Sequence, residues 1–191
     1  MPRPSLKDAR RKEILDAYGR CIARHGVAGT TLELIAEEAG LARALIRHNV
    51  GNKEEILDAF VERYLTVATA EVDELFDSLP GKKRIETMIE WLFDPAYSDS
   101  QEVNVSNALF MAAVERPSLA KPLCQWTAAF TRRMEAELSD VYGVSGERVE
   151  AVAAGIVAIY YNYESLALLG DLPRLRKTSE AAAHALVSTL A

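Results

Sequence analysis

A short stretch around residue 45 combines side chains that can read DNA. Ile46 and Val50 are four residues apart, so on a helix they share one face and can pack inward together. The side chains that then point outward are Arg43, Ala44, Arg47 and His48. An arginine can donate two parallel hydrogen bonds to a guanine, and a small neighbour such as alanine leaves room for close approach to the base edges. The spacing predicts a helix that enters the major groove of DNA.

The sequence before this stretch predicts the elements that position it. A helix over about 6–24 precedes a short helix over 31–38, which Thr30 and Glu33 begin with a capping box. A tight turn then leads into the third helix, over about 42–49. Two short helices joined by such a turn behind a longer helix are typical of the helix-turn-helix, although an ordinary corner in a helical bundle has the same lengths and caps.

The rest of the chain is also predicted to be helical. Strong helix formers dominate it, and no pair of alternating segments around a two-residue turn indicates a hairpin. Asn52 and Glu55 form a second capping box, which begins a long helix that ends near Ser78. Further helices are expected over about 82–94, 101–116, 117–142, 145–169 and 172–190. The predicted fold class is therefore all-α.

Charge is distributed unevenly along the chain. The formal net charge of −6 argues against nucleic acid as a partner of the whole surface. Residues 1–55, however, hold ten Lys and Arg against eight Asp and Glu, whereas residues 56–191 hold twelve against twenty. The first twelve residues alone contain five bases, which are Arg3, Lys7, Arg10, Arg11 and Lys12. Either only the N-terminal part touches an anionic partner, or these bases lie on an unevenly charged, solvated helix face.

Composition excludes several other classes of protein. Glycine and proline total 17 of 191 residues, too few for a collagen-like or low-complexity chain. No apolar run approaches the about 18 residues of a membrane span, and neither a membrane segment nor a signal peptide is expected. Cys21 and Cys124 are far apart and neither has metal-ligand spacing around it. The chain is interpreted as a reduced, cytoplasmic protein.

Catalytic, metal and cofactor sites are not expected. The three histidines fall on separate predicted elements, without a carboxylate or thiol at a matching spacing. No glycine-rich phosphate loop, HExxH or GxSxG motif occurs. Asn162 and Glu164 lie within an apolar helix but have no partnered base or nucleophile nearby in sequence. A helical small-molecule carrier or enzyme, in which residues 1–55 only pack, is the alternative to a DNA-binding protein.

An ordered set of short motifs resembles the TetR family of bacterial transcription regulators over about residues 6–60. The motifs are RKEILDA at 11–17, HG at 25–26, TTLELIA at 30–36, AGL at 39–41 and GNKEEIL at 51–57. The resemblance implies a helix-turn-helix DNA-binding domain of three helices over 1–55. It implies a helical effector-binding and dimerisation domain over 56–191, with about nine helices in all.

The resemblance also implies DNA contacts at matching positions. Thr31 and Lys53, at the starts of the second and fourth helices, match phosphate-contacting positions, where free N–H groups favour anions. The family's recognition helix corresponds here to Arg43, Ala44, Leu45, Arg47, His48 and Asn49. The family usually has Tyr where Arg47 stands and an aromatic residue where Val50 stands. DNA binding is therefore expected, whereas the operator sequence is not predictable.

The acidic C-terminal part contains residues that could line an effector site. Aromatic walls with a few polar anchors are how small-molecule sites are usually built. The candidate residues are Trp91, Asn104, Asn107, Met111, Trp126 and Phe130. Plain core packing with exposed asparagines is the alternative for any one of them.

The last two predicted helices, over about 145–169 and 172–190, are rich in Ala, Leu and Tyr. Such helices form either a central core or a helix–helix interface. In the TetR family the last two long helices of each subunit form a four-helix dimer interface, which implies a homodimer here, with Tyr163 as a candidate interface residue. A twofold dimer would present two reading helices to two half-sites of double-stranded DNA.

The resulting hypothesis is a repressor that a small-molecule effector releases from its operator. Such an effector must bind the arrangement that does not fit DNA more tightly, or it shifts nothing. The helix over 53–78 is expected to be the only continuous element that joins the two parts.

Overall fold

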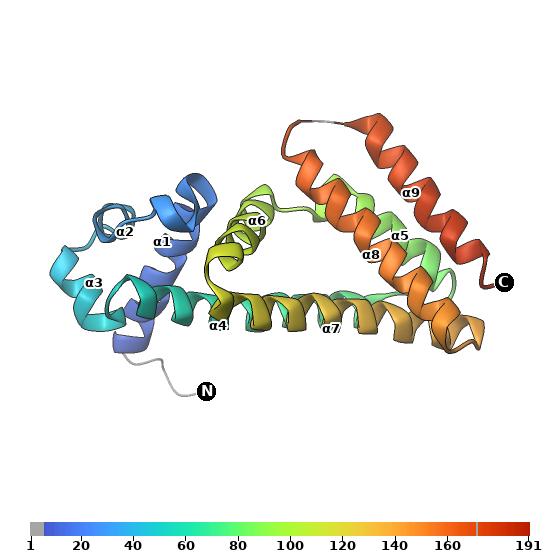
Figure 1. Cartoon of the computed structure of the whole chain (residues 1–191), viewed down its shortest axis with the longest axis horizontal. Coiled ribbons are helices and arrows are strands. Elements are labelled where there is room, and N and C mark those ends of the chain that lie inside the picture. The colour runs from blue at the N-terminus through green and yellow to red at the C-terminus, as the bar shows by residue number, and fades with distance from the viewer. Residues whose placement is uncertain (1–5, 171) are drawn as a thin grey trace. The chain divides into compact units, whose positions relative to one another are not determined.

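The computed structural model describes residues 6–170 and 172–191, so Arg3 lies outside the described residues. In this part of the chain there are nine α-helices and one 3₁₀ turn, and the predicted all-α fold is confirmed (Figure 1). The helices are α1 Leu6–Gly29, α2 Leu32–Ala39, α3 Arg43–Val50, α4 Lys53–Ser78, α5 Arg84–Phe93, α6 Ser100–Glu115, α7 Pro117–Tyr142, α8 Glu147–Ala167 and α9 Pro173–Ser188. The 3₁₀ turn η1, Pro95–Tyr97, follows α5.

The chain divides into two compact units. The first unit comprises Met1–Ala68 with Asn104–Ala120, and the second comprises Thr69–Val103 with Lys121–Ala191. The sequence predicts that the helix over 53–78 is the only one that joins the two parts of the chain. The corresponding helix, α4, does have residues in both units. So do α6 and α7, and the two units therefore share three helices.

In the first unit, α1 packs against the two short helices α2 and α3. The apolar stripe of α1 is buried, and the fully buried side chains of the unit include Ile14, Tyr18, Ile22, Ile35 and Ile46. Gly19 allows close packing, because a Cβ atom there would lie 3.0 Å from the ring of Phe60. The helical spacing of the sequence thus supplies one shared core for the three N-terminal helices.

The start of α2 lies one residue later than the capping box predicts. Thr31 is the N-cap, and its Oγ1 accepts a hydrogen bond from the Leu34 N–H at 3.3 Å. Thr30 is buried, and its hydroxyl donates to the carbonyl of Gly26 at 2.8 Å. Gly26 interrupts α1 with a φ of 67°, which glycine adopts readily. Because the Thr30 hydroxyl binds the carbonyl at this kink, Thr31 caps α2 instead.

The capping box at the start of α4 is confirmed. The Asn52 side chain accepts hydrogen bonds from the backbone N–H groups of Glu54 at 2.9 Å and Glu55 at 3.1 Å. In return, the Glu55 carboxylate accepts from the Asn52 N–H at 2.8 Å. Three backbone N–H groups at the start of α4, those of Asn52, Glu54 and Glu55, are satisfied in this way.

The core of the second unit lies between α5, α8, α9 and the parts of α4 and α7 that belong to it. Helices α8 and α9 lie side by side (Figure 1). Their close approach depends on Gly155, where a Cβ atom would lie 2.8 Å from the Leu186 side chain. Tyr163 is buried in this core, with its ring centroid 5.4 Å from that of Phe93. Its prediction as an interface residue is therefore wrong, because the protomer already covers it.

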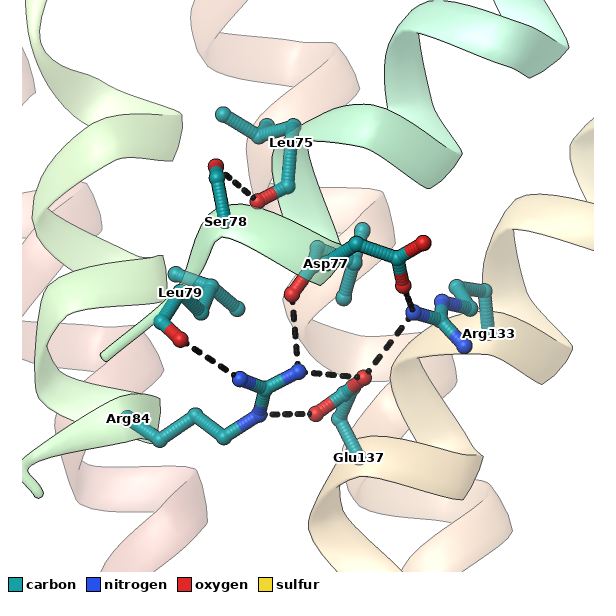
Figure 2. Close-up of polar contacts among 8 residues, drawn as sticks. Leu75, Asp77, Ser78, Leu79, Arg84, Arg133 and Glu137 are labelled. Atoms are coloured by element: carbon teal, nitrogen blue, oxygen red, sulfur yellow. Dashed lines mark hydrogen bonds and ion pairs between the residues drawn. The ribbon is translucent and has the colours of Figure 1, made fainter. Parts of the chain in front are cut away.

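A polar network fastens the end of α4 within the second unit (Figure 2). Arg84 donates to the carbonyl oxygens of Phe76 at 2.7 Å and Leu79 at 2.8 Å, where α4 ends. The same guanidinium forms an ion pair with Glu137 of α7 at 2.6 Å. Arg133, one turn earlier on α7, lies 3.3 Å from Glu137 and 2.7 Å from Asp77. The C-terminal turn of α4 is thus tied to both α5 and α7.

Candidate nucleic-acid interface

Helix α3 presents the predicted residues to solvent. Ile46 and Val50 are buried, which confirms that they anchor the inward face of the helix. The four residues of the opposite face, Arg43, Ala44, Arg47 and His48, are exposed. Ala42 provides no side-chain cap at the N-terminus of α3, so free backbone N–H groups and the helix dipole add positive potential beside the two arginines.

Two further residues of α3 lie at the border of this face. Leu45 is exposed, whereas Asn49 is half-buried. The Asn49 side-chain amide donates to the carbonyl of Leu45 at 2.8 Å. One N–H of the Asn49 side-chain amide is therefore already used within α3, and the second N–H and the side-chain oxygen remain its other hydrogen-bonding groups.

The two phosphate-contact candidates stand at helix N-termini. Thr31 is exposed at the start of α2, and Lys53 begins α4. The Lys53 ammonium donates to the carbonyl of Ala28 at 3.0 Å. This bond ties the start of α4 to the segment after the Gly26 kink. An ammonium has three donors, so Lys53 can hold this carbonyl and still reach a phosphate.

An ion pair that sequence reasoning missed joins α2 to α3. The Arg43 guanidinium lies 2.6 Å from the Glu33 carboxylate, and both side chains are more than half exposed. Hydrogen bonds from its own backbone N–H and from the Thr31 side chain hold the pKa of Glu33 below its ordinary value. Glu33 and Arg43 each lie in the first turn of their own helix. They are ten positions apart in sequence, so the spacing of residues along one helix could not predict their contact. Glu33 therefore holds Arg43 in place on the exposed face.

The orientation of α2 on α1 is held by a second cluster. Glu38 accepts hydrogen bonds from Arg20 at 2.5 Å and from Arg24 at 2.7 Å. The two guanidinium groups hold the pKa of the Glu38 carboxyl at about 2, well below its ordinary value of 4.5. Both arginines lie on α1, one turn apart, so the cluster holds the C-terminal end of α2 against α1. The turn that leads into α3 follows directly after this end.

We expect Glu38→Gln to destabilise the protein at pH 7 but not in acid. The folded-state pKa of Glu38 is lowered, so its contribution is complete above the unfolded-state pKa near 4.5 and is lost as pH falls toward 2. Urea denaturation at pH 7, 4 and 3 should show the gap between wild type and variant closing. Glu37→Gln, at an exposed neighbour on α2, is the control and should leave stability unchanged. A gap that is equally wide at all three pH values would contradict the prediction.

The candidate effector residues are divided between the two units. Trp91, Trp126 and Phe130 belong to the second unit, and Asn104, Asn107 and Met111 to the first. The structure brings Trp126 and Phe130 together at Tyr161, with ring centroids 6.4 Å and 6.3 Å from that of the tyrosine. Trp91 instead packs on Tyr97 at 5.4 Å, and Met111 is 70% exposed. Tyr161 and Tyr97 are aromatic neighbours that the sequence did not assign to a site.

Helices α8 and α9 expose small side chains on their outer surface. The exposed alanines are Ala151, Ala154, Ala158, Ala181, Ala182 and Ala185. A shallow groove of about 380 Å³ runs between the two helices and is lined by Ala158, Ile159, Asn162, Thr178, Ser179 and Ala182. Small side chains allow the backbone of another helix to approach closely.

Neither a membrane-spanning helix nor a cluster of metal ligands occurs among the described residues. No helix in residues 6–170 and 172–191 is long and apolar enough to cross a membrane. Within the same residues, no group of three or more His, Cys, Asp or Glu is placed to hold a metal ion. Cys21 is buried and Cys124 is exposed, and both are free thiols.

Comparison with known proteins agrees with this arrangement. Residues 14–60 match the family model of bacterial regulatory proteins, tetR family. The HTH-type transcriptional regulator BetI of Burkholderia thailandensis is 25% identical over 164 residues, which cover 83% of this chain and 82% of the relative. BetI of Vibrio vulnificus is 24% identical over 162 residues, covering 83% and 81%.

Solved structures share the whole fold. A TetR-family regulator from Cytophaga hutchinsonii superposes with a TM-score of 0.83 at 14% identity, covering 98% of each chain. A transcriptional regulator from Saccharomonospora viridis in complex with choline gives a TM-score of 0.77 at 17% identity, covering 95% of this chain and 96% of that one. The fold and the exposed face of α3 define a helix-turn-helix DNA-binding transcription regulator. Its helix-turn-helix, over residues 14–60, is that of the bacterial regulatory proteins of the TetR family.

Proposed function

We propose that this regulator is a cytoplasmic repressor that binds a two-half-site operator as a homodimer and leaves it when a small-molecule effector binds. The observation that carries the proposal is the exposed basic face of α3, anchored by the buried Ile46 and Val50. Arg43 and Arg47 are the residues proposed to contact bases, while Thr31 and Lys53 are proposed to contact phosphates. In this scheme residues 1–55 bind DNA and residues 56–191 bind the effector and dimerise.

Selection of DNA fragments by the purified protein tests this proposal. The selected sequences should share two half-sites related by twofold symmetry, with centres spaced by whole helical turns. Binding should weaken steeply with salt, because cationic side chains release counterions from the phosphates. A protein that enriches no sequence and binds DNA only weakly at low salt would instead support the helical carrier or enzyme.

The proposed dimer interface is the alanine-rich outer surface of α8 and α9. Ala158→Glu should convert the dimer into monomers, because it places a charge beside the groove where we propose that the partner's helices pack. Sedimentation at micromolar concentration measures this directly. Ala136→Glu, the same change at an exposed alanine of α7, is the matched control and should remain dimeric. If wild type itself sediments as a monomer, the two-half-site arrangement is wrong.

We propose that the effector binds within the second unit, where Trp126 and Phe130 meet at Tyr161 and Trp91 packs on Tyr97. Asn104, Asn107 and Met111 belong to the other unit and are not part of this proposed site. Choline is a reasonable first compound to test, because a regulator of the same fold binds it. The two tryptophans provide a fluorescence signal for titration. An effector that lowers DNA affinity must have its own affinity lowered by DNA by the same factor, typically about 5–150-fold. Compounds that bind tightly yet leave DNA affinity unchanged would exclude the effector switch.

A further inference from the structure

Glu164 is a buried acidic side chain without a cationic partner. It lies on α8 and is only 7% exposed. The Ser98 hydroxyl donates a hydrogen bond to its carboxylate at 3.0 Å. Among the residues that the structure describes, no Lys, Arg or His forms an ion pair with it. Glu137, similarly buried in the same unit, faces the two guanidinium groups of Arg84 and Arg133.

A carboxylate in such a position is costly to keep ionised. Burial disfavours the charged form and raises the pKa of Glu164, while the Ser98 hydrogen bond opposes this shift. A buried charge is usually paired, because its lost hydration must be replaced. A cationic ligand would supply the pairing that the protein itself does not.

The neighbouring side chains suit an organic cation. Tyr160 and Tyr161 precede Glu164 by four and three residues, so they lie on the same side of α8 one turn away. The Tyr160 ring centroid lies 5.8 Å from that of Phe130, and the Tyr161 centroid lies 6.4 Å from that of Trp126. Both tyrosines and the tryptophan are half-buried. Aromatic faces attract ammonium groups, most strongly where water is excluded.

A second aromatic pair, Trp91 and Tyr97, lies next in sequence to Ser98, the hydrogen-bond partner of Glu164. Ser98 directly follows Tyr97, whose ring packs on Trp91 with centroids 5.4 Å apart. The Ser98 hydrogen bond therefore brings the segment that carries the Tyr97–Trp91 pair to Glu164, while Tyr160 and Tyr161 stand one turn before it on α8. A hard metal cation would require several oxygen ligands, whereas these neighbours offer mainly rings. The combination favours a ligand whose charge is spread over alkyl groups.

We infer that Glu164 and the aromatic side chains of Tyr160, Tyr161 and Trp126 form a binding site for a small alkylated ammonium compound. The identification of this compound as the effector rests on the proposed function. Glu164 pairs with the positive charge, and the rings cover its alkyl groups. Because Trp126 belongs to the site, ligand binding changes tryptophan fluorescence.

Two compounds of the same shape test the role of the charge. The probe is (3-hydroxypropyl)trimethylammonium, and its neutral counterpart is 4,4-dimethylpentan-1-ol, in which carbon replaces the charged nitrogen. Wild type should bind the cation at least about tenfold more tightly than the alcohol, as expected for a desolvated cation–π site with a carboxylate. Glu164→Gln should reduce this preference severalfold, leaving only the contribution of the rings, and should leave binding of the alcohol unchanged. Glu150→Gln, at an exposed acid of α8, is the control and should bind as wild type.

A second variant keeps the test decisive if Glu164→Gln does not fold, which a thermal melt would reveal. Trp126→Leu should weaken binding of the cation several-fold, measured by calorimetry because one fluorophore is lost. Equal binding of the two compounds by wild type, or unchanged cation binding by a folded Glu164→Gln protein, would overturn the site. If the cation binds through Glu164 but leaves DNA affinity unchanged, the site stands and the proposed effector switch fails.

Discussion

Arg47→Ala should weaken binding to the selected operator by about 1–3 kcal/mol for each half-site, the cost of losing a direct contact to a base. Arg47 is exposed on α3, so the substitution removes no core packing and the protein should remain as stable as wild type. Fluorescence anisotropy with operator variants measures the effect. Specificity should relax at one base position in each half-site, while binding to unrelated DNA changes little.

Arg43→Ala should cost more affinity than Arg47→Ala, although both remove one exposed arginine. Without Arg43, the Glu33 carboxylate loses its partner at 2.6 Å and stays near the DNA phosphates as an unpaired negative charge. Glu33→Gln should act in the opposite direction and raise the affinity for all DNA, because it removes a negative charge. The ratio of operator affinity to affinity for unrelated DNA should fall, because Arg43 is no longer held in one orientation. Comparing the two variants thus shows whether Glu33 orients Arg43 or only contributes its charge.

Arg132→Ala is the control for these variants, since Arg132 is an exposed arginine of α7 in the second unit. It should bind operator as wild type does. If Arg43→Ala and Arg47→Ala also bind normally, α3 is not the recognition helix. If both lose stability together with affinity, the residues serve folding rather than recognition.

Local patterns in the sequence predicted much of the helix-turn-helix and of the start of α4. The four-residue spacing of Ile46 and Val50 identified the inward face of α3, and the outward residues followed from it. The Asn52–Glu55 capping box located the start of α4, because both partners lie within one helical turn. Such features depend on residues that are close in sequence, where backbone geometry alone decides which side chains meet.

Features that depend on tertiary contact were not predictable. The Glu33–Arg43 pair joins two helices, and its residues carry no shared periodicity. Tyr163 lies on a helix with apolar residues on several sides, so the sequence alone could not show that it faces Phe93 rather than a partner. Thr30 lost its expected capping role because the kink at Gly26 changed the path of the chain. Ser98, the hydrogen-bond partner of Glu164, lies 66 residues away in the sequence.

Glu137→Ala should lower the free energy of unfolding by about 3 kcal/mol, the cost expected when one partner of a buried ion pair is removed. Glu137 is 8% exposed at its side chain and accepts from Arg84 at 2.6 Å, with Arg133 at 3.3 Å (Figure 2). Its removal leaves two partly buried guanidinium groups without this carboxylate. Arg84 also holds the last carbonyls of α4, so hydrogen exchange should quicken at the end of that helix.

Asp77→Ala provides the contrast within the same network. Asp77 pairs with Arg133 at 2.7 Å but is 75% exposed, so its loss should cost less than about 1 kcal/mol. Urea denaturation compares the two variants directly, and the Arg84→Met, Glu137→Leu double variant completes the comparison. The double variant should cost less than the sum of the losses for Arg84→Met and Glu137→Leu alone, because the Arg84–Glu137 ion pair is then lost only once. Equal losses for Glu137→Ala and Asp77→Ala would show that burial does not set the strength of this network.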